Sequence, residues 1–196
     1  LPWDVISINF GLHDLGGNGP IREVPLSNYT ENLKFILNEA TKTGAEVIFT
    51  TTTPVPANYP PGSRTEKNVV AYNAAATRVA SAYCVAVNDL HGAIVRACPR
   101  SYLQDGNCSR LQWPRGVHFV HAGRELCGKV VAKAVVAAMD RAKQWRSHRK
   151  PRYYDRRGNI SLFSLPREGG GRERWCAAAA RAGARDRDSD GTGALT

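Results

Sequence analysis

The sequence predicts an α/β protein built on a parallel β-sheet. An apolar run over residues 3–10 breaks into Gly11-Leu12-His13-Asp14, as a buried strand does where it ends in a polar turn. A strand, a helix and a second strand follow one another within about fifty residues, and this order implies a parallel pair joined by a right-handed crossover. A further helix and a short apolar run, over residues 66–87, continue the alternation.

The first helix is marked at both ends. Asn28 and Glu31 have the spacing of a capping box at the helix start, and Gly44 stands where a helix ends. Between them apolar residues recur at helical spacing, namely Leu33, Ile36, Leu37 and Ala40. Residues 45–50 are then predicted to form the second strand of the βαβ unit.

The remaining elements follow from a second apolar helix and a long loop. Residues 66–83 carry a mostly apolar stripe, and residues 84–87 read as a short buried strand. Asp89 comes just after that strand; it is a site candidate, but we expect it to cap a short helix that runs through Val95. An irregular loop over residues 98–116 precedes His118, and an alanine-rich helix is expected over residues 122–145.

Composition and charge divide the chain in two. Residues 1–148 are expected to form a partial domain, because a core strand with nothing before it indicates that the first strands of the sheet are missing. Residues 149–196 are rich in Gly, Arg and Ala and are expected to be a disordered tail. Residues 141–196 carry 14 Lys or Arg against 6 Asp or Glu, so most of the net charge of +10 lies there and the folded part is nearly neutral.

This distribution argues against two classes of function. Basic residues gathered in an irregular tail, instead of on a groove-facing element, disfavour nucleic-acid binding. The sequence holds no apolar run of about 18 residues, which disfavours a membrane span. A basic tail that binds anionic partners stays open as an alternative function.

No metal or other cofactor is predicted. The five cysteines show no pair with zinc-ribbon spacing. His118 and His121 stand three residues apart, but even together with His13 and Asp14 they lack the carboxylate cluster or the HExxH pattern of a metal site.

Two features favour secretion over a cytosolic location. Cys98 and Cys108 bracket a short loop that a disulfide could close in an oxidising compartment. Three Asn-x-Ser/Thr sequons point the same way; they begin at Asn28, Asn107 and Asn159.

Two blocks, taken in order, carry a family resemblance. The strand ending in Gly-Leu-His-Asp, residues 5–14, and the block Gly116-Val117-His118-Phe119 before the last helix resemble the third and last blocks of the SGNH (GDSL-like) hydrolases. Residues 52–56 and Tyr72-Asn73 resemble a subset of this family. The resemblance covers about residues 3–140 and implies a three-layer α/β/α sandwich with a flavodoxin-like parallel sheet. It also implies hydrolysis of a small-molecule ester or an acetylated glycan through a serine acyl-enzyme.

The resemblance assigns roles to four residues. His118 corresponds to the general base of the family. His13 stands where the family has an oxyanion-hole asparagine, and a neutral imidazole N–H can donate a comparable hydrogen bond. Gly11 would let the strand turn sharply beneath the substrate, and Asp14 would hold the turn and orient His13.

Two departures from the family pattern predict that this chain is inactive alone. The nucleophilic serine belongs to a Gly-Asp-Ser block before the third block, and the sequence contains none. The family's acid, two or three residues before the histidine, is replaced by Arg115 or Gly116, and an arginine cannot accept the imidazole N–H. The other serines considered lack a nucleophile elbow: Ser7, Ser27, Ser63, Ser101 and Ser109. A non-catalytic ligand- or glycan-binding module on the same fold is therefore the alternative.

Overall fold

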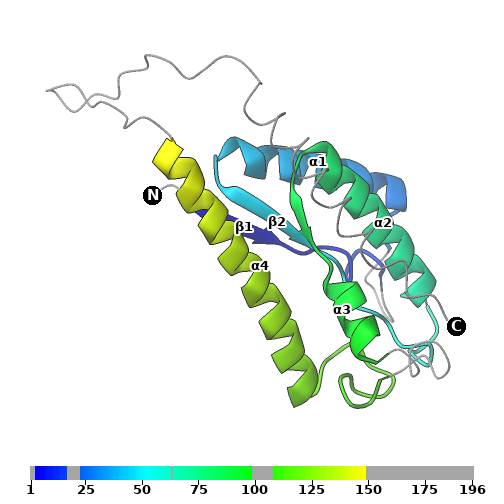
Figure 1. The fold of residues 1–196 in the computed structure, drawn as a ribbon. Helices are drawn as coiled ribbons and strands as arrows, with labels where there is room; N and C mark the ends of the chain where they lie inside the picture. The colour runs from blue at the N-terminus through cyan, green and yellow to red at the C-terminus, as the bar shows by residue number, and fades with distance from the viewer. Residues whose placement is uncertain (1–2, 17–22, 63, 99–107, 149–196) are drawn as a thin grey trace, which may run out of the picture. The chain divides into compact units, whose positions relative to one another are not determined.

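A parallel three-stranded sheet with helices on both faces forms the described part of the chain (Figure 1). The computed structural model describes residues 3–16, 23–62, 64–98 and 108–148. The elements in chain order are β1 (Val5–Ile8), α1 (Leu26–Lys42), β2 (Glu46–Thr50), α2 (Glu66–Ala82), β3 (Ala86–Asn88), α3 (Leu90–Ala97) and α4 (His121–His148). The strand order is β1-β2-β3, so each strand pairs with its successor, and the predicted α/β class is confirmed. The predicted tail and the boundary before it lie outside the described residues.

The alternation of side chains along β2 assigns a helix layer to each face of the sheet. Val47 and Phe49 belong to the core cluster that includes residues of α1 and α2. Ile48, 2% exposed, points to the opposite face. Glu46 shares that face, and its Oε2 accepts a hydrogen bond from Arg141 Nε of α4 at 3.0 Å. Helix α4 therefore covers the face that α1 and α2 leave open, and Figure 1 shows it on that side.

Helix α1 starts earlier than predicted, and the expected capping box is wrong. The helix begins at Leu26 behind Pro25, which has φ −52° and ψ 142° and provides no side-chain cap. Asn28 therefore lies inside the first turn, where its Oδ1 accepts from the Ser27 hydroxyl at 3.3 Å. The predicted helix end is confirmed, because Lys42 is the last helical residue and Gly44 follows with φ +78°.

Strand β3 differs from the predicted buried strand over residues 84–87. Cys84 adopts a left-handed φ of 55° after the end of α2, so the strand begins only at Ala86. Ala86 and Val87 are exposed because β3 lies at an edge of the three strands described. Asp89 is a helix cap, as expected: its Oδ1 accepts from the Gly92 N–H at 2.8 Å at the start of α3.

The end of the predicted irregular loop is an ordered hairpin over residues 111–120, and α4 follows it directly. Residues 99–107 of that loop lie outside the description. No helix in the described ranges has both the length and the hydropathy that crossing a membrane requires.

Candidate active site

The turn after β1 brings His13 to the carboxyl end of the sheet. Gly11 has a φ of +141°, and the chain closes behind it with hydrogen bonds from Leu15 N–H to Gly11 O and from Gly16 N–H to His13 O, both 3.0 Å. Leu15 is fully buried and anchors the turn, whereas His13 is exposed. The turn thus holds the His13 backbone in place and leaves its side chain in solvent.

Thr52 is the reason that residue 11 must be a glycine. A Cβ on Gly11 would lie 2.2 Å from Thr52 Oγ1, and this hydroxyl donates a hydrogen bond to Phe10 O at 3.0 Å. Thr52 is itself fixed by Asn73, whose Oδ1 accepts from Thr52 N–H and whose Nδ2 donates to Thr52 O, each at 2.8 Å. The chain does turn at Gly11, and the close approach of the β2–α2 loop requires a glycine there.

Two tyrosines hold the other side of the turn. Tyr29 donates from its hydroxyl to Phe10 O at 3.1 Å, Tyr72 donates to Val24 O, and the two rings pack with their centroids 4.9 Å apart. Burial raises the pKa of Tyr29 well above its usual range, and the negative charge of Asp14 adds to the shift. Burial, followed by the charge of Glu23, raises the pKa of Tyr72 to about 12. Both hydroxyls therefore act as neutral donors and hold the backbone around the turn.

His118 lies on the outer strand of the hairpin that precedes α4. Trp113 N–H donates to His118 O and Val120 N–H donates to Leu111 O, each at 2.9 Å. His118 is exposed, while its neighbour Val117 belongs to the same buried cluster as Leu15. Only the backbone at His118 is therefore constrained, as the sequence predicts for a residue between a loop and a helix.

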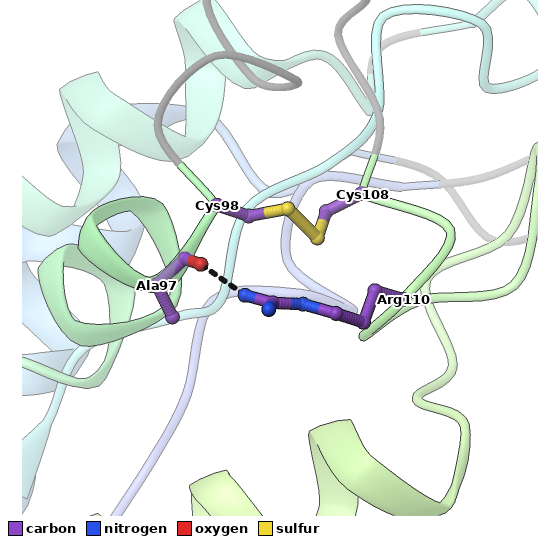
Figure 2. The surroundings of a disulfide bond; sticks show 4 residues. All are labelled: Ala97, Cys98, Cys108 and Arg110. Atoms are coloured by element: carbon purple, nitrogen blue, oxygen red, sulfur yellow. Dashed lines mark hydrogen bonds between the residues drawn. A yellow bond between two sulfur atoms is a disulfide. The ribbon is translucent and has the colours of Figure 1, made fainter.

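The base of this hairpin is anchored at two points. Gln112 is fully buried and donates from Nε2 to Pro54 O at 2.8 Å. Cys108 O accepts from Leu111 N–H at 2.8 Å and from Gln112 N–H at 2.7 Å. A disulfide joins Cys108 to Cys98 at the end of α3 (Figure 2), and this confirms the predicted pairing. Their Cα atoms are 6.0 Å apart.

The β2–α2 loop connects the two predicted halves of the site. Its Thr52 contacts Phe10 beside the Gly11 turn, and its Pro54 contacts Gln112 beside the His118 hairpin. The Gly11 turn and the β2–α2 loop follow the carboxyl ends of β1 and β2, which is where α/β proteins bind ligands. The hairpin comes after α3 and is joined to this edge through Gln112 and Pro54. The roles of His118, Gly11 and His13 in catalysis, and of Asp14 in orienting His13, stay predictions.

The position of the expected acid is occupied by Arg115, at the tip of the hairpin. Arg115 is exposed and has a left-handed φ of 55°. Asp and Asn tolerate this conformation better than Arg does. The backbone there could therefore accept an aspartate without rearrangement, although the sequence does not supply one.

Sequence reasoning did not find a third histidine at this edge, His91. Its Nε2 lies 2.7 Å from Glu66 Oε1, and Glu66 Oε2 accepts from Val55 N–H at 2.8 Å. The His91 backbone N–H donates to Thr51 Oγ1 at 3.0 Å. The pair clamps the β2–α2 loop to the first turns of α2 and α3; Glu66 and His91 are 25 residues apart, and no local motif signals their contact.

Metal ligands are not grouped in the part of the chain that the structure describes: no three His, Cys, Asp or Glu side chains there lie close enough to hold an ion.

The model of the GDSL-like Lipase/Acylhydrolase family matches residues 1–126 of the chain. The chain belongs to this family. The GDSL-like membership confirms the resemblance drawn from the Gly11 and His118 blocks and identifies the protein as a member of a hydrolase family.

Solved structures with the same fold include hydrolases from bacteria and from a metagenome. A lipase/acylhydrolase from Enterococcus faecalis is 23% identical, with a TM-score of 0.54 over 67% of this chain and 60% of that one. LAE5, an α/β hydrolase from the metagenome of Lake Arreo, is 23% identical, with a TM-score of 0.52 over 70% of this chain and 60% of that one. Axe2, an acetylxylan esterase from Geobacillus stearothermophilus, is 19% identical, with a TM-score of 0.52 over 69% of this chain and 59% of that one. This GDSL-like chain spans about 60% of the length of each. No curated protein matches it.

Proposed function

We propose that this GDSL-like chain provides the general base and part of the oxyanion site of an ester hydrolase. The observation that carries the proposal is the hydrogen-bonded connection from Phe10 through Thr52 and Pro54 to Gln112. It holds the Gly11 turn and the His118 hairpin on either side of one loop at the carboxyl edge of the sheet. This is the edge at which a member of this family would hydrolyse its ester.

The proposed chemistry is acyl transfer through a serine. His118 takes the proton of the serine hydroxyl as its oxygen attacks the ester carbonyl, and then gives that proton to the departing alcohol. His13 donates a hydrogen bond to the negative oxygen of the tetrahedral intermediate. In the second step His118 takes a proton from a water molecule as it attacks the acyl carbonyl, and returns that proton to the serine oxygen as the acyl–serine bond breaks and the acid leaves. The serine itself is not in this sequence, because the 196 residues contain no Gly-Asp-Ser block.

The replacement of the acid by Arg115 lowers the expected efficiency further. Without a carboxylate the imidazole lacks a partner that fixes its tautomer, and loss of that partner costs about 10⁴ in kcat in serine hydrolases. We therefore propose that these 196 residues alone do not turn over esters.

We propose an acetylated glycan or a small-molecule ester as the substrate class. Three considerations support this proposal: the family is one of acylhydrolases, Axe2 is named as an acetylxylan esterase, and the site residues lie at an exposed edge of the sheet. We also propose that the protein is secreted. The Cys98–Cys108 disulfide and an exposed sequon at Asn28 are compatible with that location, whereas Asn107 and Asn159 lie outside the described residues.

The role of His118 is tested in a protein that includes a serine block. The gene upstream of Leu1 is sequenced, and a product extended by an upstream Gly-Asp-Ser strand is assayed with p-nitrophenyl acetate beside the 196-residue chain. We expect turnover in the extended protein only, and His118→Ala should lower kcat by a further factor of about 10², because triad residues act as a unit and the acid is already missing.

His121 supplies the matched control, because it lies three residues away with its side chain 82% exposed. His121→Ala should leave kcat within about twofold, as is usual for exposed surface positions. Turnover by the extended protein that survives His118→Ala would show that another group is the base. Absence of any upstream serine block would favour the glycan-binding module instead.

A further inference from the structure

The hairpin that carries His118 also carries an exposed indole directly opposite to it. Gln112 pairs with Phe119 in an antiparallel bridge, and Trp113 N–H donates to His118 O at 2.9 Å. This register places Trp113 and His118 opposite each other, and opposed residues of an antiparallel pair project their side chains from the same face. The indole and the candidate base therefore leave the hairpin side by side.

Exposure distinguishes the two faces of the hairpin. Gln112, on the inner face, is fully buried, whereas Trp113 is 58% exposed and His118 is exposed as well. Within residues 108–120 Trp113 is the one large hydrophobic side chain left exposed. Pro114 and Arg115, which follow the indole in the turn, are exposed too, so the hairpin tip presents an indole, a cation and an imidazole to solvent.

The backbone beneath the indole is held firmly. Gln112 is tied to Pro54 O, Cys108 O accepts two amide hydrogen bonds, and the disulfide joins Cys108 to the end of α3. At the other end of the hairpin, Gly123 packs so closely that a Cβ there would lie 2.1 Å from Leu111 O. A flat aromatic group on a fixed backbone loses little conformational freedom when a ligand covers it.

We propose that Trp113 is a sugar-binding platform, on which the pyranose ring of an acetylated glycan stacks while its ester faces His118. The inference rests on the proposed function and names its substrate class. A pyranose has an apolar face of C–H groups and a rim of hydroxyls, and it matches one flat indole on a hairpin tip that also exposes Arg115 and His118. A long acyl chain would instead require a groove of several apolar side chains. The described part of the hairpin exposes a single large apolar side chain, that of Trp113.

Binding of acetylated xylo-oligosaccharides to the full 196-residue chain tests the platform without requiring hydrolysis. Calorimetric titration should show binding to the wild type, and Trp113→Ala should weaken it by about tenfold or more, the usual effect of removing an aromatic anchor. Trp113→Tyr, which keeps a flat ring, should restore affinity to within about threefold of wild type.

Trp3 provides the control, because it is 69% exposed and lies before β1, at the end of this strand opposite to the Gly11 turn. Trp3→Ala should leave the affinity unchanged, and thermal melts should show that each variant is folded. The platform is wrong if the wild type does not bind the oligosaccharide, if Trp113→Ala binds normally, or if p-nitrophenyl decanoate binds in its place.

His118→Ala separates the platform from the proposed function. It removes the proposed base, so ester turnover by the extended protein reports on the proposed function, whereas the oligosaccharide affinity of Trp113→Ala reports on the platform. If the extended protein hydrolyses esters without His118 while Trp113 still governs binding, the proposed function fails and the platform stands. If His118 proves essential for turnover and Trp113→Ala has no effect on binding, the platform fails and the proposed function stands.

Discussion

A glycine-to-alanine substitution at position 11 should be among the most destabilising single changes at the site. Gly11 has a φ of +141°, and an added Cβ would lie 2.2 Å from Thr52 Oγ1. Two effects follow from one methyl group. The backbone must hold a conformation that L-residues rarely adopt, and the Thr52 hydroxyl must move away from the Phe10 carbonyl that it binds.

The size of the effect is the sum of these two contributions. Residues held in such backbone conformations cost about 1–3 kcal/mol. Loss of a partly buried hydrogen bond, here that of Thr52 to Phe10, costs about 0.5–1.5 kcal/mol. The free energy of unfolding should therefore fall by about 1.5–4.5 kcal/mol, a large fraction of the ~5–15 kcal/mol typical of a domain.

Urea unfolding followed by circular dichroism measures the change, and Gly128 provides a matched control. Gly128 lies on the exposed part of α4, and a Cβ there would meet nothing within 4 Å. Gly128→Ala should therefore raise the free energy of unfolding by about 0.5–1 kcal/mol, because alanine favours the helix. The same chemical change should thus act with opposite sign at the two glycines.

A double-mutant cycle with Thr52 tests the cause. Thr52→Ala removes the hydroxyl that the new methyl group would meet, so Gly11→Ala should cost less in that background than in the wild type. If Gly11→Ala changes stability by less than about 0.5 kcal/mol, or if the two substitutions are simply additive, the close approach of Thr52 is not what requires a glycine at position 11.

Two further predictions concern the disulfide and the tyrosine pair. Replacement of both Cys98 and Cys108 by alanine should lower the free energy of unfolding by about 3 kcal/mol, as expected for a short closed loop. The same change should increase hydrogen exchange at the amides of Gln112 and Trp113. Unchanged exchange at these amides would contradict the anchoring of the hairpin by the disulfide. Because the pKa of Tyr72 is raised to about 12, the unfolded chain loses this proton first, and stability should fall as the pH rises from about 10 to about 12. Tyr72→Phe should flatten that fall in urea titrations, and an unchanged slope would show that Tyr72 does not contribute.

Local patterns in the sequence predicted the elements well where one residue type decides the geometry. Gly44 ended α1, Asp89 capped α3, and Gly11 took the positive φ that a sharp turn requires. The capping box at Asn28 failed because a proline three residues earlier started the helix first. The strand expected over residues 84–87 was shifted because Cys84 took a left-handed conformation that its side chain does not favour.

The contacts that assemble the candidate site could not be predicted from local sequence patterns. Gln112 reaches Pro54 across 58 residues, Asn73 fixes Thr52 across 21, and His91 meets Glu66 across 25. Each depends on how strands and helices pack after they form, which a single sequence does not encode in its spacing. The resemblance did single out the Tyr72-Asn73 pair and residues 52–56, and the structure shows that Asn73 and Thr52 are hydrogen-bonded partners.

The position of α4 at the end of the described domain has a consequence for folding during synthesis. Strands β1 to β3 pair in the order in which they are made, and α1 and α2 can cover one face as soon as they emerge. Among the described helices α4 is the one that covers the Ile48 face, and it is complete roughly a hundred residues after β2 has been made. At about 5–20 residues per second, these helices would leave Ile48 and Val5, the two large apolar side chains on that face, uncovered for about 5–20 s after β2 emerges.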